Sequence, residues 1–240
     1  MADPTAPLDP VKRVTRSKAQ ARNSYNRLSR WYDLLSMGAE EKVKQAGLQT
    51  LDAQPGETVL EIGFGTGHCL APLARAVGET GKAAGLDLST GMCRAAQTRL
   101  RHKNLLHLVP LTCGDAASLP FRQQTFDALF ASFTLELFDT HEISLVLAEW
   151  TRVLRPNGRL CVVSLAHLDP KSWIVRLYEK AHEKLPNWID CRPIRVCDEI
   201  EQAGYLVASV STYKMFGLPV QIVLAQSTLS TPDLLNRRID

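Results

Sequence analysis

Three acidic residues and a glycine-rich turn are the groups in this sequence whose types and spacing best suit small-molecule binding. The turn, Gly63-x-Gly65-x-Gly67, follows a short apolar run and precedes a helical pattern. In such an arrangement bare backbone can approach a nucleotide closely. Glu61 stands two residues before the first glycine. Its charge would repel a pyrophosphate and attract the ammonium of an amino-acid group.

The other two acids follow the next apolar runs. Asp87 stands twenty positions after Gly67, where its carboxylate could accept both hydroxyls of a ribose. Asp115, in Cys113-Gly114-Asp115-Ala116, could accept the exocyclic amine of an adenine. Dinucleotide enzymes use the same ribose device, so Asp87 alone leaves a nicotinamide cofactor open, although the turn lacks the G-x-G-x-x-G spacing. The apolar faces available to the adenine ring belong to Leu88, Met92 and Ala116.

Alternating strand and helix patterns must position these groups. The strand patterns occupy residues 58–62, 82–87, 105–112, 126–132 and 158–165, and the helical patterns occupy 67–77, 90–101 and 141–154. This alternation predicts an α/β fold with a parallel sheet and helices on both faces. Ligands of such sheets bind beyond the carboxyl ends of the strands. Glu61, Asp87, Asp115 and Ser132 stand at those ends.

Further elements flank this alternation. Ser17 to Gln20 has capping-box spacing and opens an amphipathic helix, and a second helix is predicted over 40–51. An inserted helix over 169–185, a helix over 194–203 and two strands over 205–213 and 219–225 end the pattern. The short link between the last two strands allows only an antiparallel hairpin. We expect a flexible leader over 1–16 and a polar tail over 228–240. Between them lies one domain over 17–227, with lid helices at 17–53 and an insert at 166–195.

Composition indicates an ordinary globular protein. The 240 residues are 45% hydrophobic and 22% charged, which is enough for one sizeable core. No apolar run approaches the roughly 20 residues of a membrane span, and the first residues lack the apolar centre of a signal peptide. The six cysteines form no C-x-x-C pair, so we predict free thiols, no zinc site and a cytoplasmic location.

Positive charge is concentrated near the beginning of the chain. Residues 11–30 carry seven basic residues and no acid, and the remaining 21 basic and 25 acidic residues leave the body at −4. That distribution argues against a general nucleic-acid binder. The amphipathic helix within this stretch has two interpretations: a lid over the site, or a peripheral contact with an anionic membrane. The oligomeric state stays open.

Several motifs resemble those of class I S-adenosylmethionine methyltransferases. They are the segment Glu61–Gly67, Asp87, Gly114-Asp115 and the helix, turn and strand of Trp150–Leu160. Within that superfamily Tyr32-Asp33 and Phe133-x-Leu135 resemble the branch of ubiquinone/menaquinone C-methyltransferases, a type 11 methyltransferase domain. The resemblance implies a Rossmann-like sandwich with a mostly parallel seven-stranded sheet and a C-terminal antiparallel hairpin. It also implies S-adenosylmethionine as cofactor and S-adenosylhomocysteine as product.

The resemblance further implies a role for each matching residue. The three glycines would line the methionine end of the cofactor, with Glu61 close to its ammonium. Asp87 would hold the ribose, and Asp115 with Ala116 the adenine. The methyl-bearing sulfonium would lie between Ser132 and Phe133. The full set of expected cofactor contacts is Tyr25, Tyr32, Glu61, Gly63, Phe64, Gly65, Gly67, His68, Asp87, Leu88, Met92, Asp115, Ala116, Ser132 and Phe133.

The catalytic side chain is left unassigned. Methyl transfer is an in-line displacement in which the cofactor brings the chemistry, and many enzymes of this fold have no obligatory catalytic group. Candidate bases at the same edge of the sheet are Glu136, Asp139, His141 and His167, and Asp139 also suits a helix N-cap. The stiff loop Trp188–Pro193 is expected to roof the acceptor.

A small or lipidic acceptor is expected, with a quinone precursor first because of the branch resemblance and the aromatic residues Tyr25, Trp31, Tyr32 and Phe133. Phospholipid headgroup N-methylation and methylation of a small thiol or phenol are alternatives. Glu61 and Asp115 disfavour a nicotinamide-dependent oxidoreductase. The intact glycine motif disfavours a module that only binds a partner.

Overall fold

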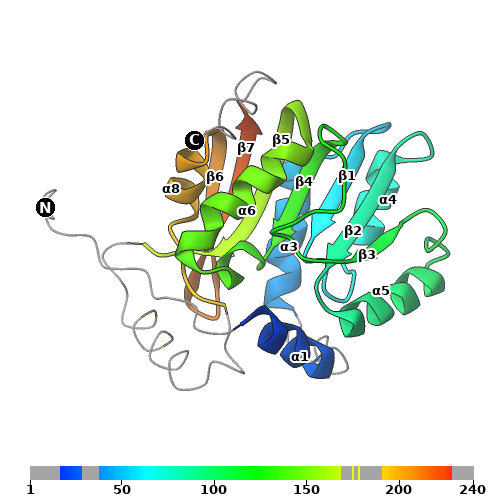
Figure 1. Cartoon of the computed structure of the whole chain (residues 1–240), viewed down its shortest axis with the longest axis horizontal. Coiled ribbons are helices and arrows are strands. Elements are labelled where there is room, and N and C mark those ends of the chain that lie inside the picture. The colour runs from blue at the N-terminus through cyan, green and yellow to red at the C-terminus, as the bar shows by residue number, and fades with distance from the viewer. Residues whose placement is uncertain (1–16, 29–37, 169–174, 176–177, 179–190, 229–240) are drawn as a thin grey trace, which may run out of the picture.

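A seven-stranded sheet with the strand order β3-β2-β1-β4-β5-β7-β6 forms the centre of the molecule (Figure 1). The computed structural model describes residues 17–28, 38–168, 175, 178 and 191–228. The strands are β1 (Thr58–Ile62), β2 (Lys82–Asp87), β3 (Leu111–Cys113), β4 (Phe126–Ser132), β5 (Leu154–Leu165), β6 (Tyr205–Met215) and β7 (Leu218–Ser227). The first five pair in parallel, whereas β7 pairs antiparallel with both β5 and β6. The predicted architecture, a mostly parallel sheet with a final antiparallel hairpin, is confirmed.

Helices cover both faces of the sheet. On one face lie α3 (Ala39–Leu51), α4 (Leu70–Val77) and α5 (Thr90–His102), and on the other lie α6 (Thr140–Val153) and α8 (Val196–Gln202). Successive strand residues point to opposite faces. In β4, Phe130 therefore joins the core of the α3 face, and Leu129 joins Trp150 of α6. Burial on both sides explains the unbroken apolar runs.

The strand order reverses between β1 and β4. From β1 the chain passes through α4, β2 and α5 to β3 at one edge, then returns to place β4 on the other side of β1. A reversal of this kind opens a crevice beyond the carboxyl ends of the two strands. The α1 helix (Lys18–Leu28) lies at that end of the sheet (Figure 1).

Several predicted boundaries were wrong, and β5 begins at Leu154 instead of residue 158. The strand expected over 105–112 is reduced to β3, because the chain first turns: Leu105 N–H bonds to the Leu100 carbonyl and Leu108 N–H to the Leu105 carbonyl. The helix expected from residue 67 begins at Leu70, because the glycine turn itself occupies the intervening positions, with Gly67 N–H bonded to the Phe64 carbonyl.

Other predictions hold or fall outside the described residues. The capping box is confirmed, since Ser17 N–H donates to Gln20 Oε1 (2.9 Å) and Gln20 N–H donates to Ser17 Oγ (3.3 Å). The leader over 1–16, the continuation of the first helix over 29–37, almost all of the helix over 169–185 and the tail from 229 lie outside the described part of the chain. The domain boundaries therefore stay predictions.

Candidate functional site

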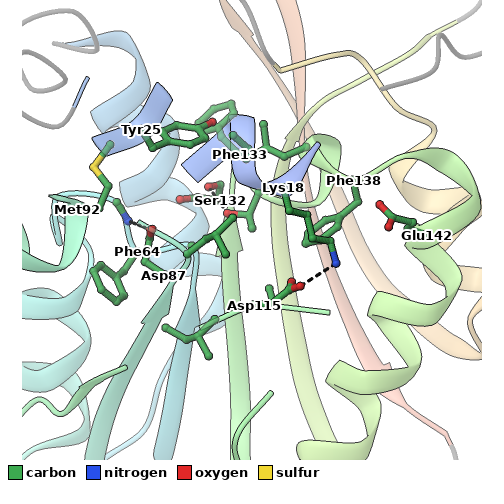
Figure 2. Close-up of a pocket in the computed structure, with 18 of the residues that line it drawn as sticks. Lys18, Tyr25, Phe64, Asp87, Met92, Asp115, Ser132, Phe133, Phe138 and Glu142 are labelled. Carbon is green, nitrogen blue, oxygen red and sulfur yellow. Dashed lines mark hydrogen bonds and ion pairs between the residues drawn. The ribbon is translucent and has the colours of Figure 1, made fainter. Parts of the chain in front are cut away.

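A cleft opens where β1, β2 and β4 end, with α1 across it (Figure 2). Its walls come from the glycine turn after β1, the residues following β2 and β4, the beginning of α5, and side chains of α1 and α3. The empty space of the cleft, including solvent at its open mouth, is about 1070 Å³.

The glycine turn brings bare backbone to the cleft. Gly63 and Gly65 adopt left-handed conformations, with φ of 72° and 55°. A Cβ at Gly63 would lie 2.1 Å from Thr134 Oγ1, so the turn after β1 presses against the loop after β4. A Cβ at Gly65 would meet nothing within 4 Å. The first glycine is therefore required by packing as well as by backbone conformation, and the second by conformation alone.

Asp87 ties the turn to α5. One carboxylate oxygen accepts the N–H of Gly65 and the other accepts the N–H of Ser89, both at 2.8 Å. Asp87 is only 9% exposed, and this burial raises its pKa to about 6 against the two hydrogen bonds, which lower it. A carboxylate has about four acceptor positions, so it can still receive the hydroxyls of a ribose.

Glu61 lies behind the turn and is 2% exposed. Burial raises its pKa to about 8, against the attraction of Lys44, while Asp87 adds to the rise. Its Oε2 has no hydrogen-bond partner among the described residues. A pKa of about 8 leaves this buried acid mostly protonated near neutral pH, and a neighbouring cation would favour its charged form.

Lys44 of α3 lines the same end of the cleft. It forms an ion pair with Glu40, and its side chain is 16% exposed. Burial alone would lower the pKa of Lys44, but the carboxylates of Glu40 and Glu61 and the Cys69 thiol together raise it. Its Nζ also lies 5.9 Å from the centre of the Phe133 ring. Lys44 in the lining, with the buried Glu61 behind it, offers opposite charges that match the two charged groups of an amino acid.

Asp115 joins the floor of the cleft to α1. Its Oδ1 accepts the N–H of Ala117 at 2.9 Å, and its Oδ2 lies 2.8 Å from Lys18 Nζ. Figure 2 shows Lys18 extending from α1 to this carboxylate across the cleft. An adenine amine at Asp115 would have to share or displace that contact.

A second polar contact holds the other end of α1. Asn26 Oδ1 accepts the hydroxyl of Ser89 at 2.7 Å and the N–H of Gly91 at 2.9 Å. These donors belong to the first turn of α5, whose N-cap is Ser89. Between the two contacts Tyr25 projects over the cleft (Figure 2). Within the described residues, α1 is thus a roof attached at both ends by polar contacts.

The loop after β4 forms the wall opposite the glycine turn. Phe133 has a left-handed backbone (φ 51°), and its N–H bonds to the Val163 carbonyl at 2.7 Å. The Thr134 hydroxyl lies within hydrogen-bond distance of the Ile62 and Ser132 carbonyls, at 3.2 and 3.0 Å. Left-handed backbone at a bulky residue is strained, and the hydrogen bond from Phe133 N–H to the Val163 carbonyl helps to hold it.

Most of the expected cofactor contacts meet in this cleft. The eleven that line it are Tyr25, Gly63, Phe64, Gly65, Asp87, Leu88, Met92, Asp115, Ala116, Ser132 and Phe133. Tyr32 lies outside the described residues, and Glu61 is buried behind the wall. Because no cofactor is present, the role of each residue stays a prediction.

Gly67 and His68 are placed away from the cleft. A Cβ at Gly67 would lie 2.9 Å from Ala96 Cβ, so this glycine allows the turn to pack closely on α5. His68 lines a groove between α3 and α4, and its Nδ1 lies 3.2 Å from Glu41 Oε2. A direct cofactor contact by either residue would need a different arrangement of the turn.

Two lysines were missed by sequence reasoning. Lys18 was assigned only to the basic stretch, and no role was given to Lys44, although both line the cleft. The partner of Lys18 stands 97 positions away, which no local pattern reveals. No local signal marked Lys44, because Lys42 stands in the same predicted helix and both follow the acids Glu40 and Glu41.

Among the candidate bases, Asp139 lines the cleft. It also accepts the N–H of Thr140 at 2.9 Å as the N-cap of α6, which confirms that prediction. Glu142, one turn further along α6, lines the cleft as well and was not named from the sequence. His141 is exposed beside them but is not part of the lining.

The other two candidates are buried outside the lining. Glu136 is fully buried, and burial raises its pKa to about 7 although its Oε1 accepts the N–H of Leu165 at 3.2 Å. His167 is 3% exposed. Of the loop Trp188–Pro193 only the last three residues are described, and Arg192 among them donates to the Phe138 carbonyl at 2.6 Å.

Among the described residues, none of the helices combines the length and the apolar character that a membrane span requires. No group of three or more His, Cys, Asp or Glu side chains in that part of the chain could hold a metal ion.

Comparison with known proteins identifies close relatives. Residues 59–158 match the family model described as a methyltransferase domain. A demethylmenaquinone methyltransferase of Lactobacillus johnsonii is 30% identical over 169 residues, covering 68% of this chain and 68% of that protein. The demethylmenaquinone methyltransferase of Desulfitobacterium hafniense is 30% identical over 152 residues, covering 62% of this chain and 59% of that protein. This chain therefore spans less than two thirds of the length of the Desulfitobacterium hafniense protein.

Solved structures share the fold at lower identity. An S-adenosylmethionine-dependent methyltransferase from Aquifex aeolicus has a TM-score of 0.63 at 22% identity, covering 84% of this chain and 97% of that one. The cyclase SpnF has a TM-score of 0.70 at 16% identity, covering 90% and 98%. These likenesses show the fold alone, and the reaction has to be argued from the site.

Proposed function

This chain belongs to the S-adenosylmethionine-dependent methyltransferase family, and from that membership we propose that it methylates a small aromatic or lipidic acceptor, with a reduced quinone ring precursor first. The cofactor, when bound, supplies a methyl group on a positively charged sulfur. Two relatives named as demethylmenaquinone methyltransferases support the acceptor class.

In the proposed complex, charges at the two ends of the cleft orient the cofactor. Glu61 and Lys44 receive the ammonium and the carboxylate of the methionine part, since Glu61 is a buried acid with one oxygen lacking a hydrogen bond and Lys44 is a cation in the lining. Asp87 accepts the ribose hydroxyls. Asp115 receives the adenine amine, and Met92 contacts the ring. Each contact is made by a different element, so binding depends on the correct packing of β1, β2 and α5.

The acceptor is proposed to occupy the end of the cleft beyond Ser132. Phe133, Leu137 and Phe138 line that end and form an apolar wall suited to an aromatic ring. The carboxylate of Glu142, at its edge, is the proposed acceptor of the proton that leaves a hydroxyl or ring carbon (Figure 2). This apolar wall, with the carboxylates of Asp139 and Glu142 also in the lining, is the observation that carries the proposal.

Label transfer tests the acceptor. The protein is incubated with methyl-labelled S-adenosylmethionine and a short-chain prenyl naphthoquinol, and the products are separated into organic and aqueous phases. We expect label in the organic phase with the reduced ring and none with the oxidised quinone, which lacks the nucleophilic hydroquinone. In a second reaction a cell extract is supplied as the source of acceptor. Label that appears only in the aqueous phase of this reaction would overturn the lipidic acceptor and favour a polar metabolite.

Binding of nucleotides tests the cofactor separately. S-adenosylhomocysteine should bind, whereas NAD should not, because its pyrophosphate would meet the region of Glu61. Measurement of both by titration calorimetry separates a wrong acceptor from a wrong cofactor. Tight NAD binding would revive the oxidoreductase alternative.

A further inference from the structure

The edge of the sheet farthest from β3 is a long strand with an open outer side. β6 ends the strand order there and pairs with β7 (Figure 1). Among the described residues, no backbone hydrogen bond joins the outer side of β6 to another element. The N–H and C=O groups along such an edge form a template on which another strand can pair.

This edge has few of the features that normally prevent pairing. Natural edge strands are protected by charges, prolines or bulges. The segment Tyr205–Tyr213 contains neither a charged residue nor a proline. An irregular register with β7 between Val207 and Ser209 marks a bulge near its beginning. Beyond the bulge the regular, uncharged part is Ser209–Tyr213, and Lys214 is the only charged residue in the rest of the strand.

Exposed apolar side chains gather at the same edge. Of the seven large apolar side chains that are exposed among the described residues, four belong to β6 or to its turn with β7: Leu206, Val210, Tyr213 and Phe216. Every residue from Ala208 to Lys214 is exposed. Both faces of the sheet beside this edge are therefore open to the side chains of a neighbouring strand.

The chemistry of the edge limits the partner to another strand. The opposite edge of this sheet, β3, has three residues and cannot match the eleven residues of β6. The long edge that this protein itself can offer is β6 of a second copy. Two antiparallel copies of β6, related by a two-fold axis, would cover each other and close the assembly, as in most homodimers.

The charges around β6 favour a second copy. With the two-fold axis at Ser211, the middle of the uncharged part, Lys214 of each copy stands opposite Ala208 of the other. Lys214 shares a face of the sheet with Val210, whose partner Val223 belongs to the core beneath α8. The α8 helix has three acidic residues and no basic one. Each Lys214 therefore approaches the side of the other copy that carries the acidic helix, and the two lysines stay apart.

We propose that two copies of this chain dimerise by antiparallel pairing of β6, which joins their two sheets into one. The parallel strands of the two copies then run in opposite directions, so the two clefts open at opposite ends of the dimer. Because the exposed stretch from 208 to 214 is short for a stable interface, the dimer should dissociate on dilution. The dimer is independent of the cofactor and of the acceptor.

Two measurements on the full chain test the dimer. Sedimentation velocity over a range of protein concentrations should show a shift from the mass of one chain to twice that mass. Hydrogen exchange at a low and a high concentration should show amide protection gained within β6 and none gained in α6. A single-chain mass at every concentration would overturn the proposal, and growth beyond two copies would overturn the closed pairing.

A matched pair of variants tests the place of the contact. Ser211→Lys puts two like charges opposite each other at the proposed two-fold axis, which opposes cross-strand pairing. Ser144→Lys makes the same change at an exposed position of α6. We expect Ser211→Lys to remain a single chain at concentrations where the parent protein and Ser144→Lys are dimers. A dimer that persists in Ser211→Lys, or one that is lost equally in both variants, would overturn β6 as the interface.

Thermal unfolding and calorimetry with S-adenosylhomocysteine complete the test. Both variants should unfold and bind as the parent protein does, because neither serine lines the cleft. A loss of stability in Ser211→Lys would leave the decision to hydrogen exchange on the parent. Failure of the parent to bind S-adenosylhomocysteine would contradict the cofactor assignment, while sedimentation still tests the pairing of β6.

Discussion

The floor and the roof of the cleft are held by different forces. The floor consists of the ends of β1, β2 and β4, whose residues pair in parallel register and are almost all buried. The roof is α1, whose residues are mostly exposed where they are described. It is fixed by the contact of Lys18 with Asp115 and by the contacts of Asn26 with α5.

From this difference we expect the floor to hold the cofactor and the roof to control its entry. Separating the strands of the floor would break the sheet. The floor therefore opens only when the whole domain unfolds. Opening the roof removes one exposed ion pair and a few partly buried hydrogen bonds, which are far fewer contacts than the sheet has. We therefore expect cofactor and acceptor to exchange by movement of α1, while the binding residues of the floor stay in place. The following predictions test that division, from the largest expected effect to the smallest.

A matched pair of glycine substitutions tests the floor most strongly. Gly63→Ala adds a Cβ against Thr134 to a left-handed position, whereas Gly65→Ala adds one to a left-handed position with open space. We expect Gly65→Ala to lower the free energy of unfolding by about 1 kcal/mol through strain. Gly63→Ala should cost about 1–3 kcal/mol more through overpacking. Urea denaturation measures both, and equal losses would contradict the close contact between the two loops.

Asp87→Ala tests whether the Asp87 side chain both holds the glycine turn to α5 and binds the cofactor. The substitution leaves the N–H groups of Gly65 and Ser89 without their acceptor and removes the proposed ribose contact. We expect S-adenosylhomocysteine to bind about tenfold more weakly or worse, since each lost buried partner costs about 1–3 kcal/mol. Asp87→Asn, which keeps one acceptor oxygen, should retain more stability than Asp87→Ala. An unchanged affinity in both variants would remove Asp87 from the cofactor site.

The raised pKa of Glu61 in the floor should make the free energy of unfolding depend on pH. Its pKa rises from its usual 4.5 to about 8 on folding. Between those values the folded protein holds a proton that the unfolded chain has released, so stability falls as the pH rises from about 4.5 to about 8. Glu61→Gln removes this dependence, and its stability relative to the parent should increase across that window. Thermal unfolding from pH 5 to 8 measures the difference, and parallel curves would contradict a buried neutral acid.

The same carboxyl links pH to cofactor binding. A cofactor ammonium beside Glu61 favours the charged carboxylate, so binding should release a proton near pH 7. The affinity for S-adenosylhomocysteine should then increase from pH 6 to pH 8 in the parent and change less in Glu61→Gln. Calorimetry in buffers of different ionisation enthalpy counts the proton. Proton uptake instead of release would contradict the placement of the ammonium.

The floor was also the part that the sequence predicted best. Buried parallel strands leave long apolar runs, and a turn that must be left-handed leaves glycines, so the ends of β1, β2 and β4 could be placed from local patterns. The exception was β3, where Leu105 and Leu106 look like a strand but pack against the core from a turn. Periodicity cannot distinguish these two ways of burying a short apolar run.

For the roof, the sequence predicted the α1 helix itself but not the contacts that attach it to the rest of the domain. The capping box at Ser17 was readable because both partners are local. The contacts that attach α1 were not readable, because Asp115 and Ser89 are distant in sequence and their pairing depends on the finished fold. Likewise, nothing local distinguishes Lys44 from any other helical lysine until α3 has packed against the sheet.

The attachment of the roof gives the smallest effect. Lys18→Ala removes the ion pair with Asp115, whereas Arg22→Ala removes the same charge from an exposed position on the same helix. The Lys18 side chain is 45% exposed, so the pair contributes little to stability, and unfolding should change by less than about 0.5 kcal/mol in either variant. We expect Lys18→Ala to change the dissociation rate of S-adenosylhomocysteine about two- to fivefold, because a contact of up to ~1 kcal/mol controls opening of α1.

Stopped-flow measurement shows whether the dissociation rate rises or falls. Faster dissociation than in Arg22→Ala means that the ion pair keeps the roof closed over the ligand. Slower dissociation means that Lys18 competes with the adenine for Asp115. Equal rates in the two variants would contradict a gating role for α1.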